Sequence, residues 1–308
     1  MEVLAVTCIR AGHIKLLQSL TIDNFRDVEN YVIIPNNGQI TYMLEKQQYT
    51  VAEGDILLIP SGQPMTITYG KGNNPVTLKN HYFPSGRKYY ETIQKPAFKV
   101  HFENFSYVTF EAHVLNTINF FALLGMPALV IKDHEPLGKI LKNILLESST
   151  ETVGSSRMVK AYTEQLVIEI VRHLITKRLF IEKLGAHLDY FNTPRLISIL
   201  HYIPRNLHGD LSNRMLATVA RVSEDYVGQY FKILTGINPQ TYVENQRMER
   251  AVKLLRTTPQ SIRDIGKEVG FKDTAYFCRR FKMKFGIPAG KMRSQGHSCT
   301  VSQTLHVR

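Results

Sequence analysis

Hydrophobic residues near the end of the chain recur at helical spacing. Ile262, Ile265 and Val269 lie at i, i+3 and i+7, which is the apolar stripe of a short amphipathic helix. Gly270 follows as a residue that tolerates a left-handed conformation just after a helix end. The pattern therefore predicts a short helix that stops at a sharp turn.

A second helix is expected to begin at Lys272 or Asp273. Phe277, Phe281 and Phe285 repeat every fourth residue and form its buried side. The other side carries small or basic residues, which are Thr274, Ala275, Cys278, Arg279 and Lys282. Two helices joined at a short turn, with a basic outer face on the second, are typical of a helix-turn-helix in the DNA major groove. A packed helical pair without a DNA-binding role has the same spacing.

A partial copy of this pair lies earlier in the chain. Ser212 and Ser223 are expected to cap its two helices. The second of these helices has inward and outward positions at Val227, Phe231 and Leu234, and at Glu224, Asp225, Gly228, Gln229 and Lys232. Both copies end on Phe-Lys-x3-Gly-Ile, at residues 231–237 and 281–287, and residues 240–255 predict a helix between them. Matching ends indicate a repeated module rather than one chance helix pair.

These residues resemble the signature of AraC/XylS transcription regulators over residues 193–293. The matching positions are Arg247, Ala251, Leu254, Leu255, Ile262, Ile265, residues 269–271, Tyr276, Phe277, residues 280–282, Phe285 and Gly286. Two departures stand out: Gly266 replaces the usual Ala, and residues 287–293 lack the usual Thr-Pro-Ser-x-Tyr-Arg-like ending. The resemblance implies a DNA-binding regulator that is not an enzyme and needs no cofactor. Its implied partners are double-stranded promoter DNA and RNA polymerase.

Positive charge is concentrated in the same part of the chain. The net charge is +12, and residues 193–295 hold 18 Lys and Arg against 8 Asp and Glu. The remainder holds 20 against 18. A surface that is Lys-rich only for solubility would place the excess in both halves, whereas phosphate contact predicts the observed bias.

Outward position and the family match together suggest the DNA contacts. The expected base contacts are Asp225, Gln229, Thr274, Ala275, Cys278 and Arg279, and the expected phosphate contacts are Lys232, Arg247, Arg280, Lys282 and Lys284. A guanidinium can bind guanine O6 and N7 together, which makes Arg279 the sharpest candidate. Gly228 offers no side chain and Asp225 repels phosphate, so we expect the second module to discriminate more.

Residues 1–110 predict short strands separated by turn clusters, as in a small antiparallel barrel or double-sheet jelly roll. Gly54-x5-Pro60-x-Gly62 resembles the second cupin motif, but Met65 stands where that motif has a metal-binding His. A lone thioether is a poor replacement, so we expect no metal. His101 and Glu103 share a strand face, but no first cupin motif accompanies them.

In AraC-like regulators such a barrel commonly holds an effector, so a small-molecule or protein effector is implied. Aromatic and polar residues either line that cavity or fill a plain core, and the pattern fits both: Tyr31, Tyr42, Tyr69, His81, Tyr82 and His101. The fold expected overall is a two-domain α+β chain with a cupin-like barrel and an all-α double helix-turn-helix domain.

From Phe110 the pattern turns helical, and residues 111–180 are expected to form a helical region. A long amphipathic helix at 157–180 has an apolar face wide enough to pack on its own domain or on a second copy. The resemblance favours a homodimer. Residues 181–192 are expected to be a linker, 193–295 the DNA-binding domain and 296–308 a disordered tail.

Cys8, Cys278 and Cys299 show no close pairing, which fits a reducing compartment. No apolar run is long enough to span a bilayer, and the N-terminus lacks the charged start of a signal peptide, so we expect a cytoplasmic protein with no membrane partner. Two alternatives remain open at this point. One is a metal-dependent cupin enzyme with a DNA-binding tail, and the other is a nonspecific DNA-binding protein.

Overall fold

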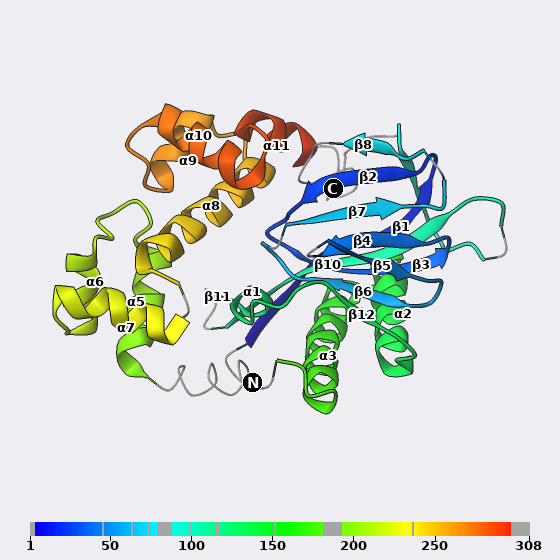
Figure 1. Ribbon diagram of the computed structural model, residues 1–308, viewed down its shortest axis with the longest axis horizontal. Coiled ribbons are helices and arrows are strands. Elements are labelled where there is room, and N and C mark those ends of the chain that lie inside the picture. The colour runs from blue at the N-terminus through cyan, green and yellow to red at the C-terminus, as the bar shows by residue number, and fades with distance from the viewer. Residues whose placement is uncertain are drawn as a thin grey trace. The chain divides into compact units, whose positions relative to one another are not determined.

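The computed structural model describes the chain at residues 4–44, 46–62, 64–72, 74–78, 88–98, 100–114, 118–150, 152–180, 193–235 and 237–296. The described residues form two compact units, one up to residue 180 and one from residue 193. The first contains the strands and the second is helical (Figure 1). The linker expected at 181–192 and the tail expected after 296 lie outside the described residues.

The N-terminal unit contains two β-sheets. The seven-stranded sheet has the order β12-β6-β3-β10-β1-β9, with β11 paired to β10. Its strands are β1 (Leu4–Leu16), β3 (Asn30–Asn37), β6 (Ile56–Ile59), β9 (Tyr90–Ile93), β10 (Asn104–Val114), β11 (Ile118–Asn119) and β12 (Leu129–Ile131). The five-stranded sheet has the order β5-β4-β7-β2-β8. Its strands are β2 (Leu20–Phe25), β4 (Ile40–Leu44), β5 (Gln47–Val51), β7 (Met65–Tyr69) and β8 (Val76–Leu78).

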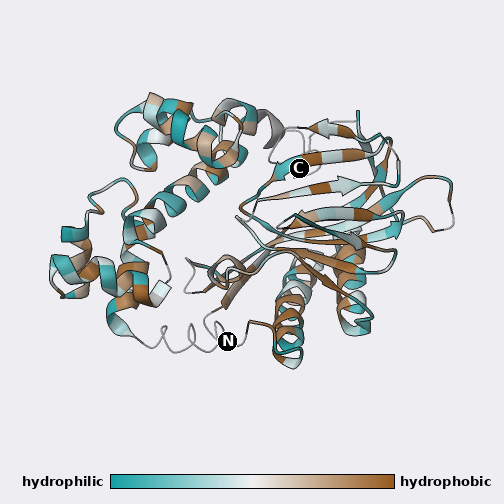
Figure 2. Cartoon of the chain, viewed as in Figure 1, coloured by the Kyte–Doolittle hydropathy of each residue, from teal (hydrophilic) through white to brown (hydrophobic). Residues whose placement is uncertain are grey.

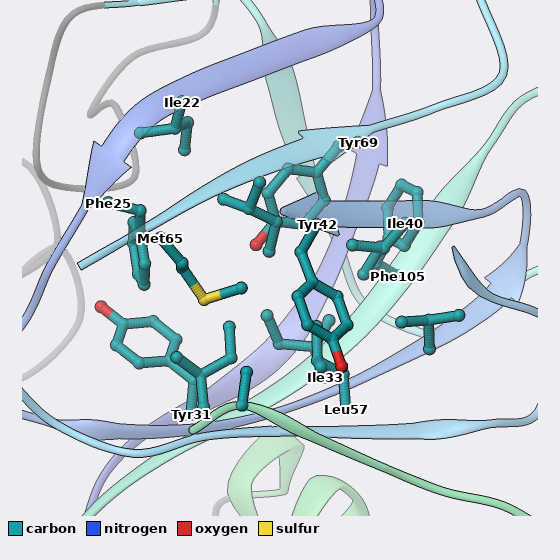
Figure 3. Close-up of a cluster of buried hydrophobic side chains, with 14 of the residues drawn as sticks. Ile22, Phe25, Tyr31, Ile33, Ile40, Tyr42, Leu57, Met65, Tyr69 and Phe105 are labelled. Atoms are coloured by element: carbon teal, nitrogen blue, oxygen red, sulfur yellow. The ribbon is translucent and has the colours of Figure 1, made fainter. Parts of the chain in front are cut away.

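A hydrophobic core fills the space between the two sheets. Alternate residues of β7, which are Met65, Ile67 and Tyr69, are buried, as the two-residue period of a strand requires. They meet Phe105 of β10 from the other sheet, whose ring lies 5.5 Å from that of Tyr69 in an edge-to-face arrangement (Figure 3). The strand pattern thus confirms the expected double-sheet domain.

The expected change to helix at Phe110 is wrong. Strand β10 continues to Val114, and a four-residue helix, α1 (Phe120–Leu123), follows β11. Both faces of β10 are buried around Phe105. Phe105 faces the core between the sheets, and the buried Ser106 lies on the opposite side of the strand. From Phe110 to Val114 the buried residues alternate with the half-buried Glu111 and His113, which is the two-residue period of a strand and not that of a helix.

Two long helices, α2 (Glu135–Ser149) and α3 (Ser155–Thr176), pack against each other and against β1 of the first sheet (Figure 1). The domain itself buries most of the apolar face of α3, at Leu166, Val167, Ile170, Val171 and Leu174. Ile168 and Ile175 remain exposed on the other side of that helix.

The C-terminal unit consists of α5 (Pro194–Arg205), α6 (Asn213–Ala220), α7 (Glu224–Thr235), α8 (Pro239–Thr257), α9 (Ile262–Glu268), α10 (Thr274–Phe285) and α11 (Ala289–Gly296). Helix α8 connects a module of α6 and α7 to a module of α9 and α10 (Figure 1). These helices carry both hydrophilic and hydrophobic stretches, as expected when one side is buried (Figure 2). The double-module prediction is confirmed, and α11, which packs on α8, was not predicted.

Polar side chains cap the helices of both modules. Ser212 accepts a hydrogen bond from the Met215 N–H at the start of α6, and Ser261 accepts one from Asp264 at the start of α9. Asp273 caps α10 in the same way. Each cap satisfies one backbone donor that the first helical turn leaves unpaired.

Candidate DNA-binding surface

The turns of the two modules have the same backbone design. In the first, Arg221 adopts a φ of 54°, and the Val222 N–H donates to the Ala217 carbonyl over 3.0 Å. In the second, Gly270 adopts a φ of 91°, and the Phe271 N–H donates to the Gly266 carbonyl over 2.8 Å. A left-handed residue followed by a hydrogen bond from the next N–H to the carbonyl five residues earlier is a common helix C-cap. The sequence repeat is therefore also a repeat of local geometry.

The glycine at position 266 has a packing role. It is buried in α9, and a Cβ added there would lie 3.2 Å from Cδ1 of Phe277 on α10. An Ala at this position would crowd the ring, so the glycine lets the two helices approach closely. This offsets part of the helix-propensity cost of glycine, which is about 1 kcal/mol relative to Ala.

The second helix of each module, α7 or α10, exposes most of the predicted base contacts; these two are called the reading helices below. Asp225, Gln229, Ala275 and Arg279 are exposed, whereas Thr274 and Cys278 are half-buried. The buried side of α10 consists of Phe277, Phe281 and Phe285, as predicted. Within the described part of the chain, the Arg279 side chain makes no hydrogen bond or ion pair, so its guanidinium is available to a ligand.

The predicted phosphate contacts fall into two groups. Lys232 and Lys282 are exposed on the reading helices. Arg280 instead donates twice to the Glu244 carboxylate of α8, over 2.6 and 2.5 Å, and this contact raises the pKa of Arg280. Lys284 donates to the Asn245 side-chain oxygen. These two cations attach α10 to the connecting helix, a role that the sequence pattern did not indicate.

Arg247, another predicted phosphate contact, also makes bonds inside the protein. Its Nε donates to the Leu207 carbonyl over 3.0 Å and its Nη2 to the Gly209 carbonyl over 3.3 Å. The guanidinium lies 5.9 Å from the centroid of the Phe271 ring, and burial lowers its pKa. Arg247 therefore joins the loop after α5 to the turn of the second module, across the connecting helix.

The predicted effector residues of the N-terminal unit do not form one group. Tyr31, Tyr42 and Tyr69 lie in the buried cluster between the sheets, and burial raises the pKa of Tyr42 to about 12 (Figure 3). His101 is exposed outside this cluster. His81 and Tyr82 lie outside the described residues.

A buried ionic cluster lies beside Tyr31. The Tyr31 hydroxyl donates to the Asp27 carboxylate, and Arg10 donates to Glu29 over 2.7 Å. Asp27 and Glu29 are almost fully buried although their sequence is typical of a surface turn. Sequence patterns gave no signal for this cluster, because only the fold places Arg10 opposite the two carboxylates.

In the ranges that the structure describes, no group of three or more His, Cys, Asp or Glu is placed to hold a metal ion. Met65, which replaces the cupin histidine, is buried in the core. No described helix is both long and apolar enough to cross a membrane.

Comparison with known families identifies both units. Residues 216–295 match the helix-turn-helix domain family, and residues 30–125 match the AraC-like ligand binding domain. The chain belongs to the AraC-type transcriptional regulators. This regulator is 27% identical over 263 residues to an HTH-type transcriptional regulator of Haemophilus influenzae, with 83% of each chain aligned. It is 22% identical over 272 residues to the HTH-type transcriptional regulator MtrA of Neisseria gonorrhoeae, with 86% of each chain aligned.

Solved structures show the same fold. ToxT from Vibrio cholerae O395 covers 98% of this AraC-type regulator and 100% of its own chain, with a TM-score of 0.54 and 11% identity. An apo structure of a ToxT variant from Vibrio cholerae strain SCE256 covers 95% of this regulator and 96% of its own chain, with a TM-score of 0.53 and 9% identity. At such low identity the similarity concerns the two-domain fold of the regulator and not its contacts.

Proposed function

We propose that this regulator binds promoter DNA by inserting α7 and α10 into successive major-groove segments on one face of the duplex. The observation that supports this most directly is the repeat of an exposed reading helix at each end of α8. With 19 residues, α8 is about 28 Å long. One turn of B-DNA measures about 34 Å, so the connecting helix suits modules that bind one turn apart.

The base contacts are assigned to the exposed outer positions. Arg279 donates to guanine O6 and N7, and Gln229 binds adenine through its N6 and N7 edge. Asp225 and Ala275 lie beside these positions and limit which bases fit. Thr274 and Cys278 are half-buried and lie one turn apart on α10, so they are assigned secondary base contacts.

The phosphate contacts are assigned to Lys232 and Lys282, whose side chains are exposed. Arg280 and Lys284 instead attach α10 to α8, and Arg247 of α8 binds the loop after α5. They favour binding by holding the reading helices in position, and any phosphate contact they make is secondary.

Paired alanine variants of the full-length regulator test these roles. Arg279→Ala is expected to lose about 1 to 3 kcal/mol at one base pair and to relax specificity there. Lys282→Ala is expected to weaken binding to all sequences alike and to reduce the salt dependence by about one phosphate. A uniform loss of affinity for Arg279→Ala across all sequences would contradict its role in base recognition.

The N-terminal unit is proposed to bind an apolar small-molecule effector. Three observations support this: the match to AraC-like ligand binding domains, the apolar cluster between the sheets, and a ToxT structure solved with an unsaturated fatty acid bound. A thermal-shift screen that compares fatty acids with sugars and metals tests it. Stabilisation by sugars alone, with no response to fatty acids, would contradict an apolar ligand.

The regulator is further proposed to act as a homodimer that contacts RNA polymerase in the cytoplasm, without catalysis. The exposed Ile168 and Ile175 of α3 lie seven residues apart on one helix face, which suits contact with a second copy. Ile168→Glu is expected to shift the protein to a monomer in sedimentation experiments. An unchanged sedimentation coefficient for a wild-type dimer would place the contact elsewhere.

A further inference from the structure

The exposed hydrophobic side chains of the C-terminal unit are not scattered. Among the residues that the structure describes from 193 to 296, the large hydrophobic side chains that are exposed are Tyr226, Ile233, Tyr276 and Met283. All of them belong to the reading helices. Their exposed fractions are 46% and 48% for the tyrosines, and 65% and 73% for Ile233 and Met283.

These residues occupy equivalent positions in the two modules. Tyr226 and Tyr276 are each the third residue of their helix, and Ile233 and Met283 are each the tenth. A spacing of seven residues is two helical turns, so the tyrosine and the aliphatic residue share one face of each helix. Gln229 or Arg279 lies between them on that face, opposite the buried phenylalanines. We call Tyr-x2-Gln/Arg-x3-Ile/Met the outer stripe of each reading helix.

Ring contacts hold the tyrosines in place. Tyr226 stacks on Tyr230 with ring centroids 5.4 Å apart, and Tyr276 lies 6.2 Å from Phe271 at the turn of the second module. An aromatic side chain with few rotatable bonds and a packed neighbour loses little entropy on binding. Both outer stripes thus begin with a positioned ring at the end of the helix that approaches the bases most closely.

The charges beside the second outer stripe favour a polyanion as the occupant. Arg279 lies within this stripe and Lys282 flanks it, whereas Lys232 flanks the first stripe together with the acidic Glu224 and Asp225 of the first turn of α7. The apolar group that DNA offers in the major groove is the C5-methyl of thymine. From Tyr276 to Met283 the helix rises about 10 Å, which is about three base-pair steps. One stripe therefore spans about four base pairs.

We infer that the outer stripes read thymine: Tyr276 and Met283 contact thymine methyl groups on either side of the base bound by Arg279, and Tyr226 and Ile233 do the same around Gln229. This rests on the proposed insertion of α7 and α10 into the major groove. It adds specificity residues that outward-facing polar positions alone did not indicate. The expected site for the second module has guanine with thymine about one to two base pairs away on each side.

Replacing thymine by uracil tests the inference, because it removes only the methyl group and keeps the base pairing. The full-length regulator is first used to select its site from randomised duplexes. Affinity is then measured for duplexes in which single thymines are replaced by uracil. At each contacted thymine the expected loss is about fourfold, which corresponds to burying one methyl group.

Protein variants locate the contact. In the Met283→Ala variant, uracil at the thymine that Met283 contacts in the wild type is expected to cause no further loss of affinity. Uracil at the thymines bound by the other module should still lower the affinity. Leu146→Ala, which removes a similarly exposed side chain from α2 of the N-terminal unit, is the matched control and should retain every uracil effect.

Three results would overturn the inference. One is wild-type affinity that is insensitive to uracil at every selected thymine. Another is a uracil effect that persists unchanged in Met283→Ala and Tyr276→Ala. The third is normal DNA binding by Met283→Ala with lost transcription activation, which would assign the stripe to a protein partner. If Arg279→Ala still relaxes specificity in these cases, the proposed function stands; if it does not, the proposed function fails as well.

Discussion

The turn at Gly270 gives a prediction with a calculable magnitude. In Gly270→Ala, the added Cβ would lie 2.0 Å from the Leu207 carbonyl oxygen, and the φ of 91° is a conformation that side chains rarely adopt. The Leu207 carbonyl also accepts the hydrogen bond from Arg247 Nε. The substitution is therefore expected to strain the turn and to break the bond between Arg247 and the loop after α5.

Two contributions set the cost. The left-handed conformation costs a residue with a Cβ about 1 to 2 kcal/mol more than glycine. To relieve the overlap, the Leu207 carbonyl must move by about 1 Å, since a carbon and an oxygen rarely approach within about 3 Å. This movement removes a hydrogen bond from a charged donor, which contributes about 1.5 to 3 kcal/mol. The expected destabilisation of the C-terminal unit is thus about 2.5 to 5 kcal/mol, a large part of a typical domain stability.

Urea unfolding of the full-length protein, followed by circular dichroism at a helical wavelength, measures this cost. Gly228→Ala is the matched control, because Gly228 is helical and an added Cβ would have its nearest contact at 3.8 Å. That control should be stabilised by up to about 1 kcal/mol. In the Gly270→Ala background, Arg247→Ala should cost less than in the wild type, since the Leu207 bond is already lost. Gly270→Ala with wild-type stability would refute this description of the turn.

Single contacts give three further predictions. Burial lowers the pKa of His13, so as the pH falls the unfolded state takes up a proton before the folded state does. The free energy of unfolding of the N-terminal unit should therefore fall below pH ~6.5. Urea titrations at several pH values should show this fall in the wild type and a weaker pH dependence in His13→Gln. A double-mutant cycle of Arg280→Ala and Glu244→Ala should give a coupling of about 1 kcal/mol, and no coupling would show that the pair does not attach α10 to α8. Ser261→Ala should lower the midpoint of thermal unfolding by removing the α9 cap, at a cost of about 1 kcal/mol, whereas an unchanged midpoint would exclude a stabilising cap.

The helical half was predictable because its signals are local. Phenylalanines at every fourth residue, a glycine after a short stripe and Ser or Asp at the helix starts each depend on a few neighbouring residues. Gly270 and Asp273 occupy the turn and the cap as expected. The exposed position of Arg279 follows from the same periodicity.

The roles of the remaining cations depend on distant residues. Arg280 and Arg279 are adjacent in sequence, but among the described residues it is Arg280 that pairs with Glu244 of α8. Arg247 belongs to the family signature, yet its partners are two backbone carbonyls some 40 residues earlier. Such pairings require the tertiary fold, so a pattern of outward basic residues could not separate cations that are free to contact phosphate from those with bonds inside the protein. The continuation of β10 beyond Phe110 is a different case, because Glu111 and His113 alternate with the buried Phe110, Ala112 and Val114 and this local pattern does indicate a strand.

Selection of binding sites from randomised duplexes by the full-length regulator tests the central claim most directly. Two short clusters of preferred base pairs, about one helical turn apart, are expected, and Arg279→Ala is expected to remove the preference for one base pair in a single cluster. A single cluster, no sequence preference, or equal loss in both clusters for Arg279→Ala would contradict recognition by two reading helices.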